Sequence, residues 1–418
     1  MRLLPRTAVE KPLYLTYLVN WLCGIGVIEY PMGRPRPWLS FGYSGGCLVV
    51  YCTLAVLAAP ELAHCFPAEM LLPTTILFYS HIVLTVSTIV LGWLRSEGMR
   101  ACILNLAATD SLMDRFEATS KNYSRVAPCR MLEIVARLAM VLFIMILSSY
   151  LFYEEDTPSR TRVLVSVVLS YPVMLMFVAD TTFINIVNCV TYRFRNLNDL
   201  LENMLSESNE FRRSDRSKRS FEEKYTKWNM NISESAKKDQ WNNIKLAKKI
   251  HLALVNICQE ADRSYGLQII LSSVVAFAII TGNMYVNYLV LVELHLPRQI
   301  MMKSIIGGAI WIAYYTLKIR CFSCVCTRCV EQSVTIGDIV NKFYDDPVIQ
   351  LETQAEIRDF NIQMIQQPLK FTACGFLTID FTLVQGMTAT ITTYLMVMVQ
   401  LRKSSTSYAM MNAINSTK

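Results

Sequence analysis

The sequence predicts an all-α, polytopic membrane protein with seven transmembrane helices, a cytosolic N-terminus and an extracellular C-terminus. Apolar residues make up 53% of its 418 residues and charged residues 17%, whereas soluble domains contain about 45–50% apolar and about 25% charged residues. The apolar residues are concentrated in long uncharged runs, and the basic residues alternate between the segments that separate those runs. These features exclude a soluble enzyme and a nucleic-acid-binding protein.

The expected spans follow from the length of the apolar runs. A helix needs about 20 apolar residues to cross a hydrocarbon core about 30 Å thick. Seven segments meet this requirement: Trp38–Pro60, Leu72–Leu94, Met131–Tyr153, Arg162–Val190, Gly266–Leu291, Met302–Leu317 and Phe381–Leu401. Spans one to four therefore lie within residues 38–190, spans five and six within 266–317, and span seven at 381–401.

The N-terminal segment, residues 1–37, contains an additional apolar run at Tyr14–Ile28. This run is 15 residues long, which is shorter than a span requires. It lacks the small-residue cleavage site of a signal peptide. We expect an interfacial or re-entrant helix, and an eighth span is the alternative.

The orientation follows from the basic residues, which concentrate in cytoplasmic loops. The N-terminal segment and every second loop together carry 32 Lys and Arg residues, and the other segments carry 6. The N-terminus is thus expected inside, which is the reverse of the orientation of a G-protein-coupled receptor. Residues 191–265 become a cytosolic loop in which helical extensions of spans four and five flank a mobile loop at Phe211–Gln240. Residues 318–380 become a cytosolic helical region, and 402–418 an extracellular tail.

The last span carries small and polar residues at helical spacing along one face. The spacing alone favours close helix packing and leaves open the wall of a water-filled path. The residues of this stripe are Thr382, Gln385, Gly386, Ala389, Thr393, Met396 and Gln400.

The end of this span resembles the C-terminal signature of insect gustatory receptors, which is Thr-Tyr, five hydrophobic residues and Gln-Phe. Residues Thr393–Leu401 read TYLMVMVQL and fit eight of the nine positions, including Thr393, Tyr394 and Gln400, with Leu401 in place of Phe. Upstream, the FTACGF sequence at Phe371–Phe376 resembles the lead of that family into its last helix.

This resemblance implies a tastant-gated, non-selective cation channel in the plasma membrane of sensory neurons, without a cofactor or a metal. It implies a homo- or heterotetramer formed with related receptors, in which the cytosolic helix ends form the intersubunit anchor. The last helix lines the pore, and Gln400 lies near the gate. The pore residues are then Thr382, Gln385, Ala389, Thr393, Met396 and Gln400. The ligand, whether a sugar, a bitter compound or another small organic molecule, is left open, as are the alternatives of a metabotropic seven-span receptor and a small-solute transporter.

A ligand pocket is expected in the outer halves of spans two to six, which are rich in aromatic and polar residues. His81 lies about 13 Å below the outer boundary, where an ionisable group needs a partner or a cavity. A neutral histidine bonded to a neighbouring helix, and tyrosines of an interfacial belt, are the alternatives. The candidate residues are Tyr79, His81, Ser149, Tyr150, Ser170, Tyr171, Asn287, Tyr288, Trp311 and Tyr314.

Three further features concern charged residues and cysteines. Glu133 and Arg137 are spaced as a structural ion pair along one helix. Asp180 lies about 27 Å along span four, near the inner boundary. The four cysteines within Cys321–Cys329 have metal-like spacing, but on a continuous helix their sulfurs would not converge. Palmitoylation and an ordinary helix surface remain open for them.

Overall fold

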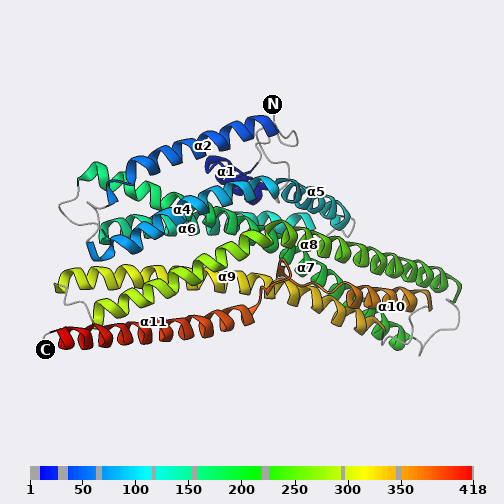
Figure 1. Cartoon of the computed structure of the whole chain (residues 1–418). Coiled ribbons are helices and arrows are strands. Elements are labelled where there is room, and N and C mark those ends of the chain that lie inside the picture. The colour runs from blue at the N-terminus through cyan, green and yellow to red at the C-terminus, as the bar shows by residue number, and fades with distance from the viewer. Residues whose placement is uncertain are drawn as a thin grey trace.

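The computed structural model describes residues 10–26, 36–62, 68–114, 119–152, 158–218, 226–292, 297–344 and 351–416. Long helices run side by side in an elongated bundle, with one short two-stranded hairpin (Figure 1). The elements are α1 (Glu10–Leu22), α2 (Pro37–Ala58), α4 (Ala68–Leu94), α5 (Ser96–Met113), α6 (Thr119–Phe152), α7 (Ser159–Lys218), α8 (Thr226–Val292), α9 (Arg298–Tyr344), α10 (Leu351–Gln366), β1 (Thr372–Ala373), β2 (Leu377–Thr378) and α11 (Phe381–Ser416).

Seven of the described helices are long and apolar enough to cross a membrane, which confirms the prediction of seven spans. They are α2, α4, α6, α7, α8, α9 and α11. Only 11% of the last span is buried inside the chain. The other spans also expose large apolar side chains, among them Val83, Phe143 and Val274, which require lipid or other protein chains around them.

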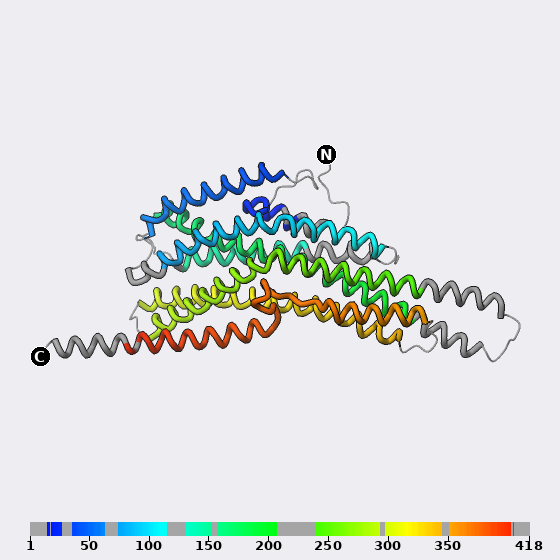
Figure 2. Tube along the Cα trace, turned by 45° about the vertical axis from the view of Figure 1, so that its right-hand side comes forward, coloured from blue at the N-terminus to red at the C-terminus, as the bar shows by residue number. Residues whose placement is uncertain are grey.

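Helices α7, α8 and α9 are much longer than a bilayer is thick. They contain 60, 67 and 47 residues, so each exceeds about 70 Å at about 1.5 Å per residue. Their far parts leave the bundle and pack with α10, at the end of the molecule opposite the C-terminus (Figures 1 and 2). We call these parts and α10 the helical extension.

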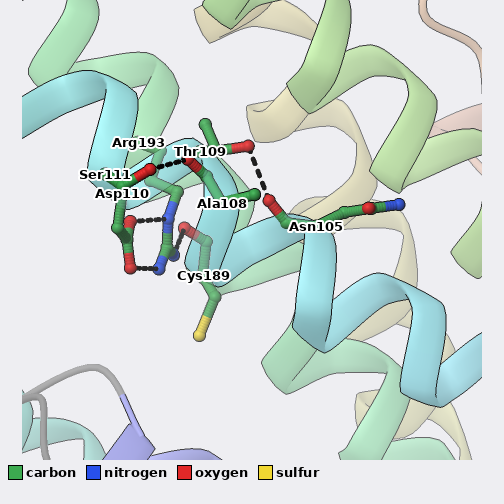
Figure 3. A network of polar contacts seen from close by, with 7 residues as sticks. All are labelled: Asn105, Ala108, Thr109, Asp110, Ser111, Cys189 and Arg193. Atoms are coloured by element: carbon green, nitrogen blue, oxygen red, sulfur yellow. Dashed lines mark hydrogen bonds and ion pairs between the residues drawn. The ribbon is translucent and has the colours of Figure 1, made fainter.

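The helical extension has a continuous apolar core. Its buried side chains come from α5, α7, α8, α9 and α10 and include Leu106, Phe194, Leu197, Ile250, Leu254, Ile336, Phe343, Ile357 and Phe360. Within this core, the fully buried Arg193 of α7 forms two hydrogen bonds with Asp110 of α5 (Figure 3). Helix α10 buries Ile357 and Phe360 in this core by packing on α8 and α9.

The structure differs from the expectation for one segment between spans. Helix continues from both sides into Phe211–Gln240, which was expected to be a mobile loop, and only residues 219–225 there lie outside the described residues. A helix that is polar on all sides leaves no apolar period in the sequence, which accounts for this difference. The second loop contains α5, and α11 continues beyond the last span to Ser416.

The segment between α10 and α11 forms the hairpin of β1 and β2. Its turn contains Cys374 and Gly375, both with positive φ (51° and 75°), a conformation that glycine adopts without strain. The carboxylate of Asp262 in α8 accepts hydrogen bonds from the Thr372 amide at 3.0 and 3.1 Å. The start of α11 is therefore tied to α8.

Residues 14–22 of the Tyr14–Ile28 run belong to α1 (Glu10–Leu22), whose 13 residues cover about 20 Å. It packs on α6 and α7, where Asn20 donates a hydrogen bond to Thr182 at 2.8 Å. The chain then turns through Gly24, with φ of 76°. This arrangement suits a helix that enters the bundle without crossing it, although residues 27 and 28 lie outside the described residues.

Candidate functional site

The two faces of α11 differ sharply in burial. Leu383 and Ile391 are each 8% exposed and pack on α8 and α9. The six predicted pore residues, Thr382, Gln385, Ala389, Thr393, Met396 and Gln400, are all exposed on the single chain. The stripe is therefore not used for packing against the described residues of its own chain.

Four threonine hydroxyls of α11 are satisfied within the helix itself. The hydroxyls of Thr388, Thr390, Thr392 and Thr393 each donate to the carbonyl four residues earlier, so none needs an outside partner. Tyr394, the second residue of the signature, lies off the stripe, with its ring edge-on to Phe277 of α8 at 5.6 Å. Helix α11 thus contacts its neighbours on one side and presents small and polar groups on the other.

Two predicted ligand residues lie in an aromatic cluster on α9. Trp311 stacks on Tyr315 at 5.9 Å, and Tyr314 contacts both rings edge-on at 5.8 and 5.0 Å. These side chains belong to one apolar cluster, which we call the α11 cluster, with members from α6, α7, α8 and α11. Its buried members are Val141, Met145, Val173, Ala276, Ile280, Tyr314, Tyr315, Ile319, Leu383 and Ile391.

The other predicted ligand residues do not all face one site. Tyr79 is 59% exposed, whereas His81 is 6% exposed. Residues two apart on a helix point about 200° apart, so these two cannot face the same pocket. Tyr150 is also exposed, at 69%. Depth and chemistry, on which these residues were chosen, do not determine the face of the helix on which a side chain lies.

Tyr171 has a structural contact instead. Its hydroxyl donates to the Cys23 carbonyl at 3.0 Å and so holds the turn after α1. The neighbouring Ser170 is half-buried, and Ser149 bonds the carbonyl of its own helix at Met145. Tyr171 and Ser149 thus form local hydrogen bonds that their chemistry alone did not reveal.

His81 and Asn287 keep unused polar atoms. The His81 Nδ1 and the Asn287 Oδ1 are buried and form no hydrogen bond with the described residues. A Cβ at Gly308 of α9 would lie 2.6 Å from the Asn287 Oδ1, so this amide packs directly on the backbone of α9, one turn from Trp311. Tyr288, the next residue, is half-buried. The predicted pocket residue Asn287 of α8 therefore lies against α9, about one turn from the predicted pocket residue Trp311.

A buried ion pair is the main polar feature that sequence reasoning did not identify. Lys318 of α9 lies 2.7 Å from Asp180 of α7, and Ser272 of α8 donates to the same carboxylate oxygen at 2.8 Å. The expected pair of Glu133 and Arg137 is also present, within α6. The charge of Asp180 within span four was a signal that a partner was needed, but nothing local in the sequence indicated which one.

The cysteines of α9 differ in environment along one continuous helix. Cys321 is exposed and Cys324 half-buried, whereas Cys326 and Cys329 are buried. Cys329 faces Cys258 of α8, with 3.8 Å between the sulfurs. Among the described residues, no group of three or more metal-ligating side chains converges.

Comparisons with known proteins agree with this architecture. Residues 13–404 match the family model described as 7tm Chemosensory receptor. A Drosophila melanogaster protein with the provisional name gustatory receptor 2a is 26% identical over 167 residues, which cover 35% of this chain and 38% of that relative. The matched region is thus well under half of the relative's length.

A solved structure has a similar fold. The insect olfactory receptor OR5 from Machilis hrabei, in complex with eugenol, superposes with a TM-score of 0.60 at 10% sequence identity. The superposition covers 94% of this chain and 98% of the receptor. At this identity, the likeness concerns the fold alone.

Proposed function

Because the family model covers most of its length, the chain belongs to the 7tm chemosensory receptor family, and we propose that it is a gustatory receptor that acts as a tastant-gated, non-selective cation channel. Receptors of this family are multi-pass membrane proteins of the plasma membrane and not enzymes. The channel function, the tastant and the assembly are the proposed steps.

The observation that carries the channel proposal is the uncovered stripe of α11. The exposed amide side chains of Gln385 and Gln400 on this stripe would be unfavourable facing lipid. In a tetramer the four copies of α11 would place their stripes toward a common axis, and the polar groups would line a path for hydrated cations. The stripe contains no fixed positive charge between Thr382 and Gln400, as a cation path requires.

The tastant site is proposed beside the aromatic cluster of α9. Trp311 and Tyr314 offer ring faces, and Asn287 offers an unused amide oxygen next to Gly308. Aromatic faces with hydrogen-bonding groups suit both sugars and flat alkaloids. These rings belong to the α11 cluster, which also contains Leu383 and Ile391 of α11. Movement of the rings therefore reaches the proposed pore helix through the apolar side chains of this cluster.

Purified full-length protein in planar bilayers provides the test. We would record potassium and sodium current while perfusing a panel of sugars and bitter alkaloids. A channel conducts when an active compound is added, with no other protein present. A metabotropic receptor would give no current without a G protein, and a transporter would give uptake of a labelled solute without single-channel events. Either result contradicts the proposal.

A further inference from the structure

The ion pair of Asp180 and Lys318 joins three long helices at one carboxylate. The Lys318 side chain is 9% exposed and that of Asp180 is 4% exposed. The second donor to Asp180, the hydroxyl of Ser272, comes from α8. A displacement of α7, α8 or α9 relative to the others therefore breaks at least one of these contacts.

Stability alone does not account for such a pair. Two charges removed from water lose hydration that their attraction only partly offsets, and apolar side chains of similar volume often stabilise a protein as well or better. The second oxygen of Asp180, Oδ1, is buried and forms no hydrogen bond with the described residues. A pair of this kind constrains relative position, because moving one partner leaves the other charge buried and uncompensated.

The pair lies between the aromatic cluster of α9 and the first turns of α11. In one direction along α9, the Lys318 ammonium lies 5.2 Å from the ring centre of Tyr315, which stacks on Trp311. In another direction, Lys318 and Ser272 border a small cavity that is also lined by Leu383 of α11. Its volume of about 10 Å³ is room for roughly one water molecule.

We infer that Asp180 and Lys318 are positioning residues for gating. They fix α9 against α7 and α8. Movement of the part of α9 that carries Trp311 is then transmitted to α11 through Leu383. This inference rests on the proposed channel function. Neither residue belongs to the pore stripe or to the proposed tastant site. Their role is to hold the helix that connects the two.

The test compares charge removal with charge exchange. Asp180→Asn combined with Lys318→Met removes both charges at similar volume, and Asp180→Lys combined with Lys318→Asp exchanges them. Glu133→Gln combined with Arg137→Met is the matched control, because it removes an ion pair between neighbouring turns of α6. The full-length proteins are compared in lipid nanodiscs by hydrogen–deuterium exchange of peptide 381–387, and in planar bilayers by basal potassium current.

The neutral double variant should elute as the native assembly, exchange about tenfold faster in peptide 381–387, and show a changed basal current. The variant with swapped charges should return the hydrogen–deuterium exchange of peptide 381–387 and the basal current toward native values, and the control should leave both unchanged. Native exchange and basal current in the neutral variant would overturn the inference, as would an effect of equal size in the control. If the single variant Lys318→Met assembles, hydrogen–deuterium exchange of peptide 381–387 should be faster in it than in the native protein.

The two proposals fail separately. If the native protein conducts in response to a tastant but peptide 381–387 exchanges alike in all variants, the channel stands and the positioning role is wrong. If no compound opens the native protein, the proposed function is wrong. The exchange of peptide 381–387 then still decides whether the pair holds α11.

Discussion

Arg193 of α7 binds both carboxylate oxygens of Asp110 in α5, at 2.7 and 2.8 Å, and donates a third hydrogen bond to the Cys189 carbonyl at 2.7 Å (Figure 3). The arginine is 1% exposed. This planar, two-point contact fixes α5, which lies in the connection between spans two and three, against the helical extension.

Asp110→Ala should destabilise the protein by about 3 kcal/mol, because it leaves a buried guanidinium without its counter-ion. Arg193→Lys should also destabilise it, since an ammonium cannot form the two-point contact. The double variant Arg193→Met with Asp110→Leu should recover much of the loss. Melting temperature followed by size-exclusion chromatography measures each variant. Equal melting temperatures for the single and double variants would show that the charges are not coupled.

Gly266→Ala should displace the hairpin, because a Cβ at this position would lie 2.9 Å from the Cys374 amide nitrogen and 3.0 Å from its sulfur. Gly282→Ala, in the same helix, is the matched control, with nothing within 4 Å of its Cβ. The control should gain up to about 1 kcal/mol of helix stability, and Gly266→Ala should lose surface expression and melting temperature. Similar behaviour of the two variants would contradict the close contact.

Asp380→Ala should weaken the start of α11 by about 1 kcal/mol, whereas Asp380→Asn should be nearly neutral. The Asp380 carboxylate accepts from the Thr382 hydroxyl and from the Thr382 amide at 2.8 Å. These hydrogen bonds hold the pKa of Asp380 below its usual value, against the opposing effect of partial burial.

The pH dependence of this cap follows from the sign of the shift. A lowered pKa in the folded state means that the cap stabilises above the unfolded value of about 3.9 and is lost as pH falls through the folded pKa. Hydrogen–deuterium exchange of the first backbone amides of α11 should therefore be faster in Asp380→Ala than in the native protein at pH 7. This difference should vanish in strong acid. A cap that failed between pH 6 and 8 would be inconsistent with this direction.

The sequence predicted the spans well because twenty apolar residues without charge have few other uses. It also identified the α11 stripe, since period and polarity on a single helix are both local properties. It did not predict contacts between side chains of different helices. Asp180 and Lys318 are far apart in the sequence, and nothing near either residue specifies the other.

The directions of the candidate pocket residues could not be predicted for the same reason. Depth along a span follows from counting residues, but the direction of a side chain depends on the rotation of its helix in the bundle. Tyr79 and His81 have similar depth but opposite faces, so depth could not show that they do not face one site. Polar helix in 211–218 and 226–240 was missed because hydrophobic periodicity cannot detect a helix without an apolar face.

Trp311→Ala and Tyr288→Ala should reduce tastant sensitivity without changing ion selectivity. One aromatic contact contributes about 0.5–1.5 kcal/mol beyond burial, so the half-maximal concentration should rise roughly 2- to 10-fold. Trp38→Ala is the control, because this tryptophan is 87% exposed at the start of α2. Dose–response curves in cells with matched surface expression measure the effect. Unchanged curves for both variants would place the tastant elsewhere.

Cysteine accessibility should separate the two faces of α11. Cysteines at positions 393, 396 and 400 should react with a water-soluble thiol reagent and block current, because the native residues are exposed on the stripe. Cysteines at 383 and 391 should be protected, since Leu383 and Ile391 are buried against α8 and α9. Block at 383 and 391 with no effect at the other three positions would place the wrong face on the pore.

Gln400→Lys tests the same face by charge. In a tetramer, four copies of Gln400 would form a ring of neutral amides near one end of the path, which can hydrate a cation without binding it tightly. Four ammonium groups in the same ring would repel a permeant cation, because charges a few ångströms apart in a narrow, weakly screened gap interact by about 4 kcal/mol per pair at an effective dielectric constant of about 20. Cation current should therefore be suppressed.

Gln400→Ala should instead raise basal current or change the permeability ratio of sodium to potassium. Tyr394→Phe, which keeps the ring against Phe277, should leave selectivity unchanged, and a selectivity change in this variant with none at position 400 would move the pore wall to the α8 side of the helix.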